Sequence, residues 1–129
     1  MAQLPLSLSL HVCEKVVVEA ETRNLTYVNC FTERKVRSFP AERISFLVCS
    51  NLVDGRGRMR LEVRIESLVD FDVLRARNGE ITFSDPHQEI RLRVPLSEVS
   101  FPTEGGYQIL VLVDNEMVAL RKIEIALVE

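Results

Sequence analysis

Apolar residues that recur at every second position are the feature that most constrains the fold of this 129-residue chain. The period is clearest in residues 58–66 and returns in residues 90–96 and 122–127. In the first of these segments the apolar members are Met59, Leu61, Val63 and Ile65. Because successive side chains of a strand point to opposite faces, this period predicts strands with one face toward a core and the other toward water.

Turn-forming residues separate these segments at intervals of about 10 residues, a spacing typical of sandwiches and barrels. Asn78-Gly79 predicts a hairpin between residues 73–77 and 80–83, because Asn-Gly favours the positive backbone angles of a type I′ turn. Asp54-Gly55-Arg56-Gly57 and Asp114-Asn115 predict further hairpin turns. Only a short helical turn is expected, near Leu96 to Val99. The pattern predicts an all-β, antiparallel sandwich of about eight or nine strands, in a single domain that covers residues 1–129.

The first residues predict a strand rather than a targeting segment. Leu4, Leu6, Leu8 and Leu10 alternate with polar residues or proline, which places the four leucines on one side. A secretory signal has a basic start and an unbroken apolar stretch, and neither is present. No apolar run approaches the roughly 20 residues of a membrane helix. We therefore expect a cytoplasmic protein with reduced thiols and no membrane partner.

The overall charge argues against one class of partner. The chain has 16 basic and 19 acidic residues, so its formal net charge is −3. A dedicated nucleic-acid binder usually carries a positive balance. The chain also has no tryptophan and few aromatic residues that could stack on bases. We expect no nucleic-acid partner.

Arginine is unusually frequent, because only three of the 16 basic residues are lysines. Arg58, Arg60, Arg64, Arg91 and Arg93 fall at the outward positions of predicted strands. Guanidinium groups match phosphate and carboxylate, so these five could form an anion-binding face. Glutamates are interleaved with them, which favours cross-strand ion pairs on a solvated face instead. Both interpretations stay open.

The cysteines and histidines give one weak catalytic candidate. Cys13, Cys30 and Cys49 lack Cys-x-x-Cys spacing and are predicted to be buried on strands. His11 and Cys13 would share a strand face, as a nucleophile and its base must. No third group is present to orient them, and the neighbouring Glu14 opposes thiolate formation. His87 falls in a predicted turn. We therefore predict no catalytic residue.

Aspartates recur in the predicted turns. Asp70 and Asp72 are the only close pair, whereas calcium takes about six to eight oxygen ligands. Turn chemistry explains aspartate at these positions without a metal. We predict neither a metal site nor a cofactor.

The strand predicted at residues 107–113 is apolar on both faces. Tyr107, Ile109 and Val111 form one face, and Leu110 and Leu112 form the other. A second dry face is covered either by the chain itself or by another protein. We therefore hypothesise a self-association or partner surface at Leu110 and Leu112.

Tyr107 follows two glycines at the start of that strand. A tyrosine at a sandwich corner buries its ring and satisfies its hydroxyl on nearby backbone. We predict this role for Tyr107.

Short motifs spread over most of the chain carry a family resemblance. They are Cys13-Glu14-Lys15-Val16, Asn24-Leu25, Val28-Asn29-Cys30-Phe31, Ser38-Phe39-Pro40, Asp54-Gly55-Arg56-Gly57, Phe101-Pro102 and Gly105-Gly106-Tyr107. With these motifs the chain resembles a group of uncharacterised bacterial proteins classed as a domain of unknown function. Residues 68–72 depart from the small polar turn expected there. The resemblance implies an immunoglobulin-like β-sandwich in a bacterium, and it implies no activity.

These observations favour a non-catalytic protein–protein interaction module, with an unidentified protein partner or a second copy as its target. The alternative is a small-ligand or anion-binding sandwich that uses the arginine-rich face. An enzyme built around His11 and Cys13 is the third hypothesis. The fold alone does not decide among them, because sandwiches host many unrelated functions.

Overall fold

Ten strands and no helix make up residues 3–129, the part of the chain that the computed structural model describes. In chain order the strands are β1 (Leu6–Cys13), β2 (Lys15–Val18), β3 (Leu25–Val28), β4 (Glu33–Val36), β5 (Ala41–Val53), β6 (Gly57–Ser67), β7 (Val73–Phe83), β8 (Ile90–Phe101), β9 (Gly105–Val113) and β10 (Glu116–Leu127). The all-β prediction is confirmed. The expected count of eight or nine strands is too low, because three strands are only four residues long and too short to show a clear period.

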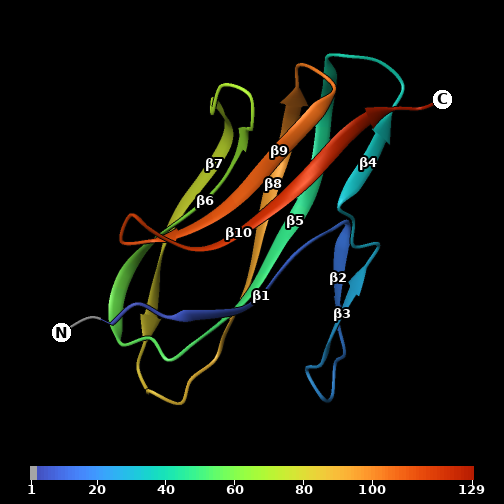
Figure 1. Ribbon diagram of the computed structural model, residues 1–129. Coiled ribbons are helices and arrows are strands. Elements are labelled where there is room, and N and C mark those ends of the chain that lie inside the picture. Colours follow the sequence, from blue (N-terminus) through green and yellow to red (C-terminus); the bar gives the residue numbers. More distant parts are fainter. Residues whose placement is uncertain (1–2) are drawn as a thin grey trace.

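The strands form three sheets (Figure 1). One has the order β1-β5-β8, a second has the order β4-β10-β9-β6-β7, and β2 and β3 make a separate ribbon. All neighbouring pairs are antiparallel except β4 and β10, which run parallel. The prediction of a wholly antiparallel arrangement is therefore wrong at this edge, where β4 adds to a strand far from it in sequence.

The hydrophobic core lies between the three-stranded and the five-stranded sheets, and β9 and β10 cross in front of β5 and β8 in Figure 1. Met59, Leu61, Val63 and Ile65 of β6 all belong to this core, as their alternation predicts. They meet side chains from the facing sheet, among them Val48, Leu52, Leu96 and Phe101. The period of two thus predicts which face of β6 is buried.

Asn78-Gly79 is not a hairpin turn, so this prediction is wrong. Both residues lie inside β7, where Asn78 pairs with Glu62 and Gly79 with Leu61 of β6. The β6–β7 turn instead occupies residues 68–72, the segment without a small polar turn sequence. Pairing along the whole of β7 outweighs the local preference of two residues, because strand preferences depend strongly on tertiary context.

The turn at Asp114-Asn115 is confirmed as a hairpin. Glu116 pairs with Val113 across it, and both turn residues have positive φ values of 49° and 65°. Asp114 strengthens it, because its carboxylate accepts a hydrogen bond from the backbone N–H of Arg60 at 2.9 Å. Asp54-Gly55-Arg56-Gly57 does end one strand and begin another, but β5 and β6 belong to different sheets, so this turn is a crossing between sheets rather than a hairpin.

A bulge in β1 reverses the predicted side of two leucines. Ser7 pairs with Leu52 and Ser9 with Asn51, so Leu8 has no opposite residue. Beyond the bulge Leu10 and Val12 face the core, whereas Leu6 and Leu8 are exposed to 61% and 62%. Because one extra residue changes the face of every side chain before it, the four leucines do not share one side.

A second bulge replaces the helical turn expected near Leu96 to Val99. Leu96 pairs with Phe46 and Val99 with Ile44, so β8 holds an extra residue there. Glu98 takes a positive φ of 53°, and its backbone N–H donates to the hydroxyl of Ser45 at 2.9 Å. The prediction of a helical turn is wrong because an apolar cluster this short does not distinguish a bulge from a turn of helix.

Tyr107 occupies the predicted corner. Its side chain is buried, and its ring packs edge-on against Phe101 with centroids 4.9 Å apart. The hydroxyl donates to the carbonyl of Thr103 at 2.5 Å. This contact ties the end of β8 to the start of β9.

Two alanine substitutions test which of the two predicted turn sequences, Asn78-Gly79 and Asp114-Asn115, forms a turn. Gly79→Ala should leave stability unchanged or raise it by about 0.5–1 kcal/mol, since the residue is extended and an added Cβ meets no atom within 4 Å. Asn115→Ala should lower it by about 1 kcal/mol, because alanine avoids a positive φ. Chemical denaturation measures both. A loss of stability in Gly79→Ala would contradict the continuous β7.

The Tyr107 corner gives a second prediction. Tyr107→Ala should destabilise the fold by about 3–5 kcal/mol, the usual cost of removing a buried aromatic side chain. Tyr107→Phe keeps the ring and should lose only about 1 kcal/mol with the hydroxyl. Thermal denaturation compares the two. Equal losses would mean that the hydrogen bond, rather than the ring, carries the contribution.

Candidate functional site

The β2–β3 ribbon lies on the outer face of the three-stranded sheet. The backbone N–H of Glu14 donates to the carbonyl of Val28 at 3.0 Å, and that of Phe31 donates to the carbonyl of Val12 at 2.9 Å. The ring of Tyr27 on the ribbon stands 5.7 Å from the ring of His11 on β1. The ribbon therefore covers side chains that would otherwise face water.

Two thiols meet on this face. The sulfur atoms of Cys13 on β1 and Cys49 on β5 lie 3.8 Å apart, and both residues are buried as predicted. Burial raises the pKa of Cys13, and burial together with the neighbouring Cys13 raises the pKa of Cys49 to about 12. Both thiols therefore stay protonated at neutral pH and are poor nucleophiles. The prediction for Cys30 is wrong, because that residue is exposed and follows β3 in a loop.

His11 and Cys13 lie on the same face of β1, as their spacing predicts. The alternate residues Leu10 and Val12 face the core, so this shared face is the outer one. His11 is half-buried and pairs with Cys49 in the strand register. His87 is exposed in the turn after Asp85, and its backbone N–H donates to the Asp85 carboxylate at 2.8 Å. That hydrogen bond is ordinary turn chemistry.

The five arginines of the predicted anion face separate onto two sheets. Arg58, Arg60 and Arg64 lie on β6 of the five-stranded sheet, while Arg91 and Arg93 lie on β8 of the three-stranded sheet. They do not form one face. Alternation predicts that each arginine points away from the core, but it carries no information about which sheet a strand joins.

On β6 two of the three arginines, Arg58 and Arg64, are paired with glutamates. Arg58 donates two hydrogen bonds to the carboxylate of Glu80, at 2.9 and 2.8 Å, and these hold the pKa of Glu80 below its usual value. Arg64 lies 3.3 Å from Glu66 and 3.6 Å from Glu62. The cross-strand interpretation therefore applies to Arg58, and Arg64 pairs with glutamates of its own strand.

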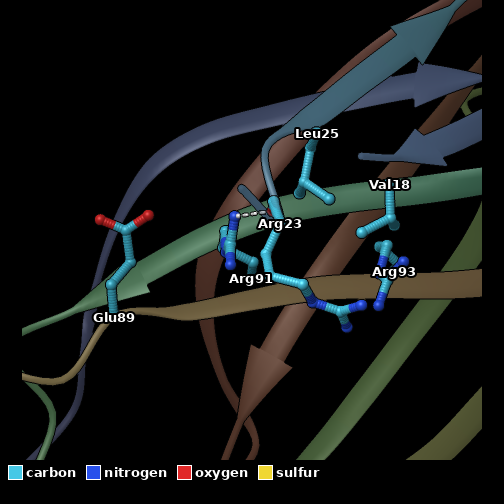
Figure 2. A pocket seen from close by; sticks show the side chains of 6 residues that line it. All are labelled: Val18, Arg23, Leu25, Glu89, Arg91 and Arg93. Atoms are coloured by element: carbon cyan, nitrogen blue, oxygen red, sulfur yellow. Dashed lines mark hydrogen bonds between the residues drawn. The ribbon is translucent and has the colours of Figure 1, made fainter. Parts of the chain in front are cut away.

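The two arginines of β8 lie close to a third arginine, Arg23. Arg91 and Arg93 line a hollow of about 250 Å³ together with Arg23, which lies at the tip of the ribbon. Figure 2 shows Arg91 hydrogen-bonded to Arg23, and the Nη1 atom of Arg91 donates to the Arg23 carbonyl at 3.3 Å. We name this the arginine hollow; its lining residues are Val18, Arg23, Leu25, Glu89, Arg91 and Arg93.

Sequence reasoning missed Arg23 because its place depends on where the ribbon docks. Arg23-Asn24 reads only as a turn, 68 residues before Arg91. The available signal is that Val16, Val17 and Val18 precede that turn, and Leu25 and Tyr27 alternate with Thr26 after it. That pattern indicates two short strands, but it does not indicate which sheet they cover.

Leu110 and Leu112 are buried, with exposed fractions of 7% and 9%. They lie on the outer face of β9, opposite the core face formed by Ile109 and Val111. In the strand register Glu62 and Arg64 of β6 stand on one side of them, and Met117 and Leu120 of β10 stand on the other. A partner that approaches this face therefore meets Met117 and Leu120 first, because both are exposed.

A second apolar surface lies where β1 approaches β10. Leu8 and Leu120 line one hollow of about 250 Å³ between these strands, with Ser7 and Arg121 among its other residues. Leu4 and Leu6 precede Leu8 and are also exposed. We name Leu4, Leu6, Leu8 and Leu120 the leucine surface. The alternation of residues 4–10 predicts that Leu4, Leu6 and Leu8 share a face with Leu10, which lies in the core. The bulge in β1 turns Leu6 and Leu8 toward the solvent instead.

The turn aspartates act on the backbone. The carboxylate of Asp70 accepts a hydrogen bond from the backbone N–H of Asp72 at 3.0 Å, so this pair builds a turn as predicted. Within residues 3–129 no group of three or more histidine, cysteine or acidic side chains is placed to hold a metal ion. The same residues include no helix that is long and apolar enough to cross a membrane.

Comparison with models of protein families places the chain in a family. The model of a family of unknown function, DUF6941, matches residues 8–126, which is nearly the whole chain. No curated protein matches. The resemblance to an uncharacterised domain family is confirmed, and the match attaches no activity to the residues described above.

The thiols give a prediction about reactivity. Iodoacetamide at neutral pH should modify only Cys30 in the folded protein, because Cys13 and Cys49 are buried and have raised pKa values. All three should react once the protein is unfolded in guanidinium chloride. Peptide mass spectrometry locates the adducts. Rapid modification of Cys13 in the folded state would instead support the nucleophilic pair with His11.

Proposed function

Because the chain belongs to DUF6941, a family of unknown function, its role has to be inferred from its own geometry, and we propose that it is a non-catalytic protein–protein interaction module. We propose further that its fold is an immunoglobulin-like β-sandwich and that it works in the bacterial cytoplasm. Two facing sheets around one core and the Tyr107 corner support the fold proposal.

The observation that carries the proposal is the leucine surface. Leu6 and Leu8 are more than three-fifths exposed, and Leu120 of β10 lines the same hollow as Leu8. No acidic, lysine or arginine side chain occurs between Gln3 and Val12. A monomeric protein gains nothing from leucines held in water, and full burial of one leucine is worth about 1.5–3 kcal/mol. A partner that covers them recovers this free energy.

The leucine surface also defines the chemistry of the partner. Its four exposed leucine side chains are uncharged and apolar, and Arg121 lines the hollow that Leu8 and Leu120 share. This arrangement resembles the apolar centre and polar rim of protein interfaces. The fitting partner is therefore a protein with an apolar patch and an acidic group at its border, and a second copy of the chain offers the same apolar patch.

The buried thiols support the non-catalytic part of the proposal. A cysteine nucleophile needs a thiolate near neutral pH, and both Cys13 and Cys49 have raised pKa values. The His11 ring faces Tyr27 rather than an orienting carboxylate. These groups fit the packing between ribbon and sheet.

The double variant Leu6→Lys/Leu8→Lys tests the proposal. Both positions are exposed, so the substitutions should not disturb the core. Charged side chains at the centre of an interface should weaken association at least tenfold. Two measurements compare the proteins: sedimentation equilibrium for self-association, and capture from a lysate of the source organism for a second protein. Phe71→Lys is the matched control, since Phe71 is 61% exposed in the β6–β7 turn, outside the leucine surface.

The proposal is supported if the wild type and Phe71→Lys both self-associate, or both capture the same second protein, and the double variant does neither. Association that survives in the double variant would contradict the leucine surface as the interface. A wild type that stays monomeric at all concentrations and captures no protein would contradict the interaction module itself. Matching melting temperatures of the three proteins establish that loss of binding is not loss of fold.

A further inference from the structure

We propose that the arginine hollow binds the phosphate group of a small phosphate ester. The site shares no residue with the leucine surface, so it goes beyond the proposed interaction function and stands independently of it. Its six lining residues come from three places: the ends of β2 and β3, the turn between them, and β8 with the residue before it. The docking of the ribbon on the sheet therefore creates the hollow.

Three guanidinium groups line this one hollow. Arg91 and Arg93 are two residues apart on β8 and so project from the same side of the strand, about 7 Å apart along it. Arg23 comes from the ribbon (Figure 2). The hydrogen bond from Arg91 to the Arg23 carbonyl links the two sides. Three donors from two segments surround a phosphate group better than a row of arginines on one strand would.

The positive charge of the hollow is not balanced by the described part of the chain. Within residues 3–129 none of these three arginines lies within 4.0 Å of a carboxylate, whereas Arg58 and Arg64 both have glutamate partners. Glu89 is the one acidic residue of the lining, and its carboxylate accepts a hydrogen bond from Asn51 at 3.2 Å. In Figure 2 the Glu89 carboxylate stands apart from the guanidinium groups of Arg23 and Arg93. A bound anion would relieve the repulsion among the three cations.

A phosphate monoester fits this lining better than other anions. It carries nearly two negative charges near neutral pH and three oxygen acceptors, which suit several guanidinium donors. Val18 and Leu25 add an apolar side to the hollow, where the organic part of an ester can pack. A volume of about 250 Å³ suits a small molecule. A single nucleic-acid strand would need aromatic side chains for its bases, and the lining has none.

Phenyl phosphate is a suitable probe because it combines a phosphate monoester with a small apolar ring. Binding is followed by NMR chemical-shift changes and by isothermal titration calorimetry. We expect saturable binding to the wild type, at least tenfold weaker binding to Arg23→Gln and to Arg93→Gln, and weaker binding at higher salt. Inorganic phosphate should bind more weakly than phenyl phosphate, because it makes no contact with Val18 and Leu25.

Arg60→Gln is the matched control. It removes the same charge from an exposed arginine on β6, in the other sheet, and should change the affinity less than twofold. An equal loss in Arg60→Gln would show that overall charge, rather than the hollow, attracts the probe, and this would overturn the proposal. Absence of saturable binding to the wild type would also overturn it. Equal affinity for inorganic phosphate and phenyl phosphate would overturn the assignment to an ester.

Discussion

The burial of β9 on both faces is the constraint on which the rest of the fold depends. β9 pairs with β6 on one side and β10 on the other, so its backbone is satisfied along both edges. Its core face packs toward the three-stranded sheet, and its outer face is closed by its neighbours, including the hydrogen bond from Gln108 to the buried Glu66. Because the side-chain amide of Gln108 donates to the Glu66 carboxylate, both buried polar groups have a hydrogen-bond partner where water is excluded. The two-residue turn at Asp114-Asn115 then fixes the register of β10.

Local pattern predicts a strand and its buried face, but not its partner or its interruptions. The core side of β6 follows from alternation because every second residue is apolar over the whole strand. The reversal of Leu6 and Leu8 does not follow, since a bulge is set by the way β1 pairs with β5. The same limit explains Asn78-Gly79, where the sequence of a turn occurs in a strand paired along its full length. Non-local pairing decides each of these cases.

The candidate sites show the same difference between what local pattern predicts and what non-local pairing decides. The outward direction of Arg91 and Arg93 could be predicted, because it depends only on the period of β8. Their separation from Arg58 could not, because it depends on which sheet each strand joins. Arg23 could not be predicted for a related reason, since a four-residue strand shows too little pattern to reveal its docking partner. The composition of both candidate sites therefore depends on tertiary placement more than on any motif.

The ribbon connects two properties that the sequence presents as unrelated. At its base it covers the face where Cys13 and Cys49 meet, which raises their pKa values, and at its tip it brings Arg23 to β8. The base is held by the backbone hydrogen bond from Phe31 to the Val12 carbonyl of β1, whereas the tip is joined to β8 by the hydrogen bond from Arg91 to the Arg23 carbonyl. An anion shared by Arg23 and Arg93 would add a second link at the tip. Ligand binding in the arginine hollow would then stabilise the ribbon on the sheet and, through it, the burial of both thiols.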